Sequence, residues 1–305
     1  MYSKILVPLD GSKLSEGILP YARSMVKALN IPVELLVVIG PEVISTFTDP
    51  GRGRYVDVVE ADMKRNSLEY LKTKARSFPV PSHVTCSTEI GSAAEAIVEK
   101  GSADSDTLIA MATHGRSGVQ RWLLGSVADK VLRATANPLL LVRSVDGDST
   151  EGGAMLKKIV VPLDGSQLAE TVLPHVKPLA QEMGLAVVLL RVYSLLTGGY
   201  MVEAEAYTPA LDKILEEIKA EATTYLEEKT RQLTREGLKN VSYMLLEGDA
   251  AGGIIDFARK TPDNLIGMCT HGRSGVGRWM LGSVTDRVVR HGGDPVLIVR
   301  AAARA

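Results

Sequence analysis

Cysteine is scarce in this chain of 305 residues, which holds only Cys86 and Cys269. The two lie in different halves of the sequence and provide no framework of disulfide bridges. This scarcity excludes a small, disulfide-stapled secreted domain. It favours a protein of a reducing compartment, and we predict a cytoplasmic location.

An excess of charge of one sign is also missing, because 35 Lys and Arg residues face 36 Asp and Glu residues. The net charge of −1 gives no overall field to attract nucleic acid or an anionic membrane surface, so any anion site has to be local. No apolar run approaches the roughly 18 residues of a spanning helix, and the first residues, MYSKILVPLDGS, lack the features of a secretory leader. We therefore expect no nucleic-acid partner, no membrane insertion and no export.

Two common nucleotide-binding motifs are absent from the sequence. It contains no phosphate loop of the Walker type and no fingerprint of three spaced glycines after its first predicted strand. His114 and His271 follow a threonine at predicted strand ends, but neither has a second histidine at metal-ligand spacing or an evident nucleophile partner, so loop hydrogen bonding is the favoured interpretation. Cys269 is more typical of a small buried hydrophobe than of a redox centre. We assign no catalytic residue and no metal ligand.

What the chain does have is an internal repeat. KILVPLDGS at 4–12 matches KIVVPLDGS at 158–166. THGRSGVQRWLLGSVADKVLR at 113–133 returns at 270–290 as THGRSGVGRWMLGSVTDRVVR, with 16 of 21 positions identical. The first pair is offset by 154 residues and the second by 157, so the middle of each unit absorbs the difference. The chain is therefore two copies of one unit.

The boundary between the copies falls near residue 150. The segment SVDGDSTEGGAML at 144–156 is rich in Gly, Ser and Asp, which is typical of a solvated linker. We predict a first domain over residues 1–146, a linker over 147–156 and a second domain over 157–305.

Each copy alternates short, β-branched apolar runs with helical patterns, which is typical of a parallel sheet. Runs such as LIAMA and LLLV show little polar alternation, as expected for strands covered on both faces. We predict an α/β fold of two tandem Rossmann-like domains, each a five-stranded parallel sheet with helices on both faces. The predicted strands are 4–10, 33–39, 83–90, 107–113 and 138–143 in the first copy, and 158–164, 186–192, 241–247, 264–270 and 295–300 in the second.

The first helix of each copy has a predicted start and a predicted break. Ser12 and Ser166 follow turn glycines and are good N-cap residues. Pro20 and Pro174 lie eight residues further on and should kink or end the helix.

The repeated segment begins as the fourth strand ends, at the edge of the sheet where ligands of such folds bind. Gly125-Ser126 and Gly282-Ser283 directly precede helical runs, and free amides at a helix start with a serine hydroxyl form a local phosphate site. Nearby arginines could add positive charge at the rim, although a solvated role explains each one alone. They are Arg116, Arg121, Arg273 and Arg278.

An aspartate, Asp10 or Asp164, stands after the first strand of each copy in the sequence PLDGS. It could accept hydrogen bonds from a sugar hydroxyl or base amine, or cap the turn that Gly11 or Gly165 completes. Taken singly, the turn interpretation is favoured. The ligand interpretation gains from the phosphate site at the neighbouring strand, because a nucleotide needs polar anchors at both ends of one cleft.

With PLDGS, THGRSG and LGSV in both halves, the chain resembles the universal stress protein family, specifically its tandem two-domain members, over nearly its whole length. Family members with bound ATP share a signature of Gly, two residues, Gly, nine residues, Gly and then Ser or Thr. Ala112 and Cys269 replace the first glycine, so we expect tighter binding in the first domain, where the added side chain is smaller. The residues that match the signature are Gly115, Gly125 and Ser126, and Gly272, Gly282 and Ser283.

The resemblance implies a nucleotide cleft in each domain. For its apolar members, core packing explains each residue alone, and only their convergence on one cleft favours contact with adenine. The implied residues are Pro8, Asp10, Val38, Met111, Ala112, Gly115, Arg116, Gly125, Ser126 and Val127 in the first domain, and Pro162, Asp164, Val192, Met268, Cys269, Gly272, Arg273, Gly282, Ser283 and Val284 in the second.

The resemblance further implies a cytoplasmic stress-response protein that binds ATP, or the related AMP or ADP, with or without Mg²⁺, and that regulates rather than catalyses. Two alternatives stay open: an interaction scaffold with vestigial clefts, and a slow ATP hydrolase. The last strands would be bare sheet edges, which proteins usually cover. In the resembled family two domains associate through this edge, which implies an intramolecular pseudo-dimer and leaves a homodimer of chains open.

Overall fold

The computed structural model describes residues 2–46, 56–115, 124–145, 151–194, 209–271 and 281–300. The chain divides into two compact units, Met1–Met155 and Leu156–Ala305. Of the predicted site residues, Arg116, Arg121, Gly272, Arg273 and Arg278 lie outside the described residues.

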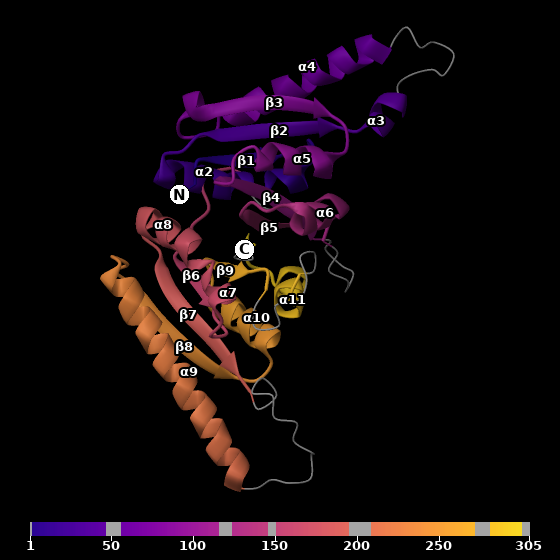
Figure 1. Cartoon of the computed structure of the whole chain (residues 1–305). Helices are drawn as coiled ribbons and strands as arrows, with labels where there is room; N and C mark the ends of the chain where they lie inside the picture. The colour runs from indigo at the N-terminus through magenta and orange to yellow at the C-terminus, as the bar shows by residue number, and fades with distance from the viewer. Residues whose placement is uncertain are drawn as a thin grey trace. The chain divides into compact units, whose positions relative to one another are not determined.

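Unit 1 is a parallel sheet in the order β3-β2-β1-β4-β5, with every neighbouring pair parallel (Figure 1). The chain runs outward from β1 to β3 and then returns to β4 and β5, so the strand order reverses between β1 and β4. Its elements are β1 (Lys4–Pro8), α1 (Lys13–Glu16), α2 (Leu19–Leu29), β2 (Val33–Ile39), α3 (Pro41–Thr46), α4 (Val56–Ala75), the 3-10 turn η2 (Pro81–His83), β3 (Val84–Ile90), α5 (Ala93–Ser102), β4 (Thr107–Gly115), α6 (Ser126–Ala134) and β5 (Leu139–Val145).

Unit 2 repeats this topology in the order β8-β7-β6-β9-β10, again with parallel neighbours. The reversal falls between β6 and β9. Its elements are β6 (Lys158–Pro162), α7 (Gln167–Glu170), α8 (Leu173–Met183), β7 (Ala186–Tyr193), α9 (Pro209–Arg235), β8 (Val241–Glu247), α10 (Ala250–Lys260), β9 (Asn264–Cys269), α11 (Ser283–His291) and β10 (Val296–Val299).

Helices cover both faces of each sheet. In unit 1, α4 packs on β2 and β3, while α5 and α6 pack on β4. In unit 2, α9 packs on β7 and β8, and α10 packs on β7. Because parallel crossovers are right-handed, the helices of the outward and the return path lie on opposite faces. The predicted α/β class with two tandem five-stranded parallel sheets is confirmed, and pairing of the units through their last strands stays a prediction.

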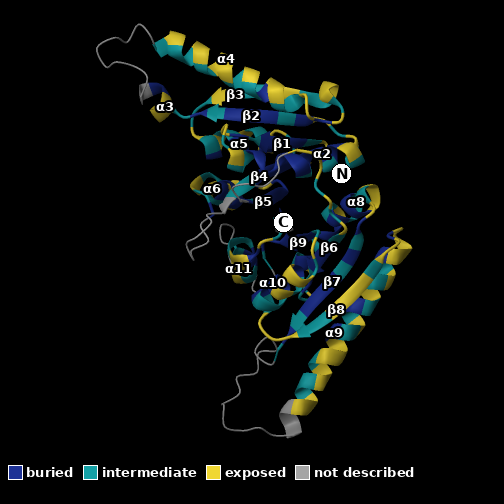
Figure 2. Cartoon of the chain, turned by 180° about the vertical axis from the view of Figure 1, so that it is seen from behind, coloured by how far each residue is buried: buried dark blue, intermediate teal, exposed yellow. Residues whose placement is uncertain are grey.

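The central strands of each unit are buried as their apolar runs predict, whereas the edge strands β3 and β8 are only partly buried (Figure 2). Ile5 and Leu6 on β1 and Leu108 and Ile109 on β4 are fully buried. The long helices α4 and α9 have exposed outer faces in the same view. Among the described helices, none has both the length and the apolar character needed to cross a bilayer.

The predicted helix starts and breaks are confirmed. Ser12 and Ser166 cap α1 and α7, each accepting a hydrogen bond from a backbone amide three residues on. Both helices end after one turn. α2 and α8 then begin with Pro20 and Pro174 in their first turn, where a proline costs no hydrogen bond.

Part of the predicted linker is fastened to unit 1. The Nη1 atom of Arg23 on α2 donates to the carbonyl of Gly152 at 2.9 Å, and Ser24 Oγ donates to the carbonyl of Ala154 at 2.9 Å. The amide of Ala154 donates back to the carbonyl of Pro20 at 3.0 Å. The segment is largely exposed but is held along α2.

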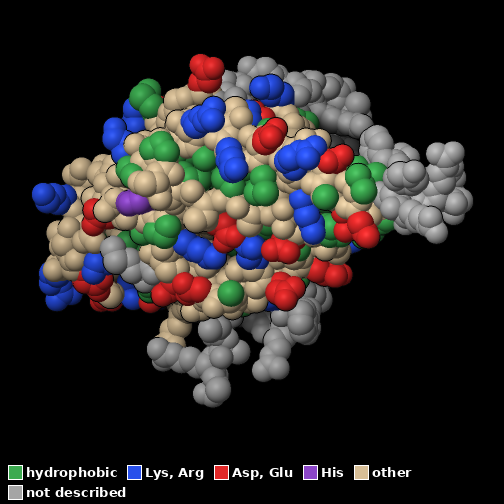
Figure 3. Space-filling model, turned by 90° about the horizontal axis from the view of Figure 1, so that it is seen from above, with side chains coloured by type: hydrophobic (Ala, Val, Ile, Leu, Met, Phe, Trp, Pro, Cys, Tyr) green, Lys and Arg blue, Asp and Glu red, His purple; other side chains and the backbone are tan. Residues whose placement is uncertain are grey.

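The face of unit 1 around α4 carries charges of both signs (Figure 3). Lys and Arg side chains are interleaved with Asp and Glu side chains among the described residues drawn there. This arrangement agrees with the balanced composition, and the described residues of this face form no continuous basic track for a phosphate backbone.

Candidate functional site

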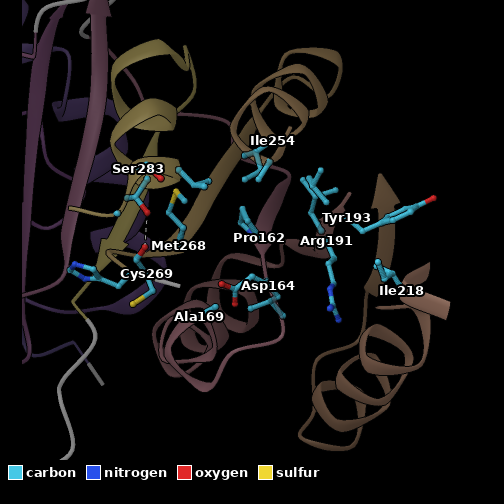
Figure 4. Close-up of a pocket in the computed structure, with 18 of the residues that line it drawn as sticks. Pro162, Asp164, Ala169, Arg191, Tyr193, Ile218, Ile254, Met268, Cys269 and Ser283 are labelled. Carbon is cyan, nitrogen blue, oxygen red and sulfur yellow. Dashed lines mark hydrogen bonds between the residues drawn. The ribbon is translucent and has the colours of Figure 1, made fainter. Parts of the chain in front are cut away.

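A cavity of about 340 Å³ opens at the carboxyl edge of the unit 2 sheet (Figure 4). Its walls come from the ends of β6, β7 and β9, from the starts of α10 and α11, and from α7 and α9, on either side of the strand reversal where such folds bind ligands. Eight predicted residues line it: Pro162, Asp164, Val192, Met268, Cys269, Gly282, Ser283 and Val284.

Unit 1 has a cavity of about 700 Å³ at the corresponding edge. Of the predicted residues, Asp10, Val38, Ser126 and Val127 line it. Among the described residues, the other predicted members occupy the same edge of the sheet or the loop before α6 without lining this cavity. They are Pro8, Met111, Ala112 and Gly125, while Gly115 is the last residue of β4. That any of these residues in either unit contacts a nucleotide stays a prediction.

The two aspartates have the same local role. Asp10 Oδ1 accepts from the amide of Ser12 at 2.9 Å. Asp164 Oδ1 accepts from the amide of Ser166 at 2.9 Å and from its hydroxyl at 2.6 Å. Each aspartate therefore has the turn role in the structure. The turns also account for the ends of β1 at Pro8 and β6 at Pro162, two residues before the predicted strand ends. Because each aspartate also lines a cavity, turn and ligand roles are compatible.

Gly282 joins the start of α11 to the end of β9. Its amide donates to the carbonyl of Thr270 at 2.8 Å, and Thr285 Oγ1 donates to the carbonyl of Cys269 at 2.8 Å. A Cβ atom on Gly282 would lie 2.8 Å from the Thr270 oxygen, closer than real Cβ contacts allow. The first turn of α11 thus lies against the strand end, with Ser283 and Val284 facing the cavity. An anion in this cavity would meet free amides at a helix N-terminus.

Cys269 and His271 mark the end of β9. Cys269 is buried and free, as predicted for a small hydrophobe, and its Sγ accepts from Thr171 Oγ1 at 3.2 Å. His271 Nδ1 lies 3.1 Å from Thr270 Oγ1, which agrees with the predicted loop hydrogen bonding. Both side chains line the cavity. A group of three potential ligands of His, Cys, Asp or Glu type is not found among the described residues.

An ionic cluster, which the sequence reasoning missed, stands behind each aspartate turn. In unit 1, Glu16 accepts from Tyr70 at 3.1 Å and pairs with Lys74 at 2.7 Å. Burial raises the pKa of Glu16, but Lys74 and Tyr70 more than offset this, so the pKa is lowered. Burial, together with the carboxylate of Glu16, raises the pKa of Tyr70 far above its usual range, and the phenol stays a donor.

Unit 2 repeats the cluster with Glu170, which accepts from Tyr225 at 2.8 Å and pairs with Lys229 at 2.8 Å. The tyrosines and lysines lie on α4 and α9, and the glutamates on α1 and α7. The cluster thereby holds the long helix of each unit against the helix that follows the aspartate turn. The sequence did contain a signal for this cluster, since its Glu, Tyr and Lys residues recur in the second copy at offsets of 154 or 155.

Arg191 and Glu221 are two further cavity residues that the sequence reasoning missed. Arg191 is 4% exposed, and its Nη2 lies 3.4 Å from Glu221 Oε1. Figure 4 shows the Arg191 side chain running from β7 into the space between Asp164 and Ile218. The available signal was a charged residue inside an otherwise apolar strand.

Comparison with known proteins agrees with the repeat. The model of the universal stress protein family matches residues 1–143 and 155–300. A universal stress protein of Mycolicibacterium smegmatis is 24% identical over 97% of this chain and 96% of its own length. One from Methanocaldococcus jannaschii is 32% identical over 49% of this chain and 85% of its own length. The crystal structure of a universal stress protein from Archaeoglobus fulgidus covers 99% of this chain and 100% of its own, with a TM-score of 0.72 at 19% identity.

Proposed function

Since this chain belongs to the universal stress protein family, we propose that it binds ATP or a related adenine nucleotide in one or both units. In this proposal the protein acts in stress response as a regulator rather than an enzyme. Its conformation or its binding partners change when a nucleotide binds or leaves. Mg²⁺ accompanies the phosphates where they are bound. The cytoplasm is the proposed location.

One observation carries this proposal. In unit 2, Asp164 from the turn after β6 and Ser283 from the start of α11 line the same cavity, with the apolar side chains of Val192 and Met268 also in its wall. A helix N-terminus favours an anion, a carboxylate favours the donors of a sugar or base, and an apolar wall favours an aromatic ring. A nucleotide presents all three features in one molecule.

Calorimetry with ATP and Mg²⁺ on the full chain tests the proposal. Binding heat and a raised unfolding temperature are expected at millimolar nucleotide, because a ligand that binds only the folded state stabilises it. Absence of both heat and thermal shift would reject nucleotide binding and favour the scaffold alternative. Multiple turnovers of ATP that Asp10→Ala and Asp164→Ala abolish would instead favour the hydrolase.

Replacing Cys269 with glycine is expected to strengthen ATP binding in unit 2. The change restores the first glycine of the family signature, and it removes a buried side chain from the cavity wall together with the Sγ contact to Thr171. Calorimetry of native and C269G proteins compares the affinities. Thr171→Val serves as the control, because it removes the hydrogen bond and keeps the side chain of Cys269. Unchanged affinity in C269G would show that Cys269 does not obstruct the ligand.

A further inference from the structure

The two cavities differ at one matched place in their walls. Arg191 on β7 and Glu221 on α9 line the cavity of unit 2. With the repeat offsets of 154 and 155, their counterparts in unit 1 are Val37 and Asn66, which line the cavity of unit 1. Unit 2 therefore has a charged pair where unit 1 has a neutral one.

Arg191 in this pair has hydrogen-bonding capacity left over. Its Nη2 donates to Glu221, and its guanidinium carbon lies 5.4 Å from the ring centre of Tyr225. Its Nη1 is buried and has no hydrogen-bond partner within the described residues. A buried donor without an acceptor is costly, so this atom favours a ligand that supplies one. The side chain of Glu221 is 73% exposed and has room to accept further hydrogen bonds.

The pair lies at the end of the cavity opposite α11. β7 and β9 flank β6 in the sheet, so the Arg191 wall and the Ser283 wall are about 10 Å apart at ordinary strand spacing. A nucleotide that places its phosphates at the start of α11 therefore brings its base toward Arg191 and Glu221. This step rests on the proposed function.

We propose that the unit 2 cavity selects a guanine nucleotide through Arg191 and Glu221, whereas unit 1, with Val37 and Asn66, takes adenine. A guanidinium only donates, and guanine offers it two neighbouring acceptors, O6 and N7, whereas adenine offers N7 beside an amino group. A carboxylate only accepts, and guanine offers it two neighbouring donors, N1–H and the 2-amino group, whereas adenine offers its 6-amino group alone. The charged pair thus makes more hydrogen bonds with guanine than with adenine.

Photo-labelling of the full chain with 8-azido-GTP and 8-azido-ATP tests this selection. Peptide mapping assigns each label to unit 1 or unit 2, and competition with unlabelled GTP or ATP gives the preference of each unit. We expect unit 2 to prefer GTP by roughly tenfold or more, as one well-formed base contact provides. Unit 1 is expected to show no such preference for GTP.

Matched exchanges between the units locate the cause. The double variant Arg191→Val with Glu221→Asn gives unit 2 the pair of unit 1, and its guanine preference is expected to disappear. Unit 1 has a valine at the position of Arg191 and also contains the Glu–Tyr–Lys cluster. We therefore expect unit 2 to fold with this exchange. The reverse variant, Val37→Arg with Asn66→Glu, is expected to give unit 1 a preference for GTP. Glu221→Gln, at an exposed position, provides a milder change if the double variant unfolds.

The outcomes separate this inference from the proposed function. Failure of both probes to label either unit would reject nucleotide binding itself and this inference with it. Labelling of unit 2 without guanine preference, or a preference that persists in the double variant and in Glu221→Gln, would overturn the inference alone. Loss of the preference in unit 2 together with its gain in the reverse variant would establish it.

Discussion

Replacing Gly282 with alanine is expected to abolish nucleotide binding in unit 2 and to lower its free energy of unfolding by about 1–3 kcal/mol. The added Cβ would lie 2.8 Å from the Thr270 carbonyl oxygen and 3.6 Å from His271 Cα. Both are backbone atoms and cannot rotate away, so the start of α11 has to move off the end of β9. That movement displaces the amides of Ser283 and Val284 from the cavity.

Gly293→Ala is the matched control for this variant. Gly293 lies just after α11, and a Cβ there would meet nothing within 4 Å. Calorimetry and urea unfolding of both variants are expected to show native behaviour in G293A and loss of binding in G282A. Native affinity for nucleotide in unit 2 of G282A would contradict the assignment of the α11 start as the phosphate site.

Replacing Lys74 with methionine is expected to cost unit 1 about 3 kcal/mol of unfolding free energy at neutral pH, because it leaves a buried carboxylate without its main partner. The side chain of Glu16 is 3% exposed, and Lys74 Nζ lies 2.7 Å from its Oε1. In unit 2 the side chain of Glu170 is 23% exposed. Lys229→Met should therefore cost less, about 1 kcal/mol, since water can solvate that carboxylate.

The pH dependence of this effect has a definite sign. The pKa of Glu16 is lowered in the native protein, so the pair stabilises the fold above the unfolded-state pKa, and this contribution is lost as the pH falls through the folded-state pKa. The difference between native and K74M proteins should accordingly shrink in acid. Hydrogen exchange of the β1 amides, measured at neutral and acid pH, reports unit 1 separately. Adding Glu16→Gln to Lys74→Met should recover most of the loss at neutral pH, and an unchanged loss would exclude the ion pair as its cause.

Local sequence patterns predicted the secondary structure of this protein well. The predicted strands 33–39 and 241–247 match β2 and β8 residue for residue. β2 is largely buried, and a buried parallel strand needs a mostly apolar sequence. Ser12 and Pro20 marked a helix start and a helix break correctly, since both act within one turn of the backbone. Predicted strand ends were less accurate at Asp10, where the side chain turns the backbone out of the sheet.

Contacts between distant segments could not be predicted in the same way. Glu16 and Tyr70 are 54 residues apart, and Arg191 and Glu221 are 30 apart, with sequence between them that differs between the copies. No periodicity within one helix or strand encodes such a pair. Aligning the two copies against each other would have revealed the shared glutamate cluster and the unmatched arginine.

Arg23 has a consequence for any dissection of the chain into separate halves. Arg23 is 7% exposed, and its guanidinium is held between Ser77 and the carbonyl of Gly152, which follows the last strand of unit 1. A fragment that stops at the end of β5 loses that carbonyl and uncovers the side of α2. A proteolytic or recombinant fragment that preserves unit 1 therefore needs the segment through Met155. This segment is part of the folded unit and is not a free linker.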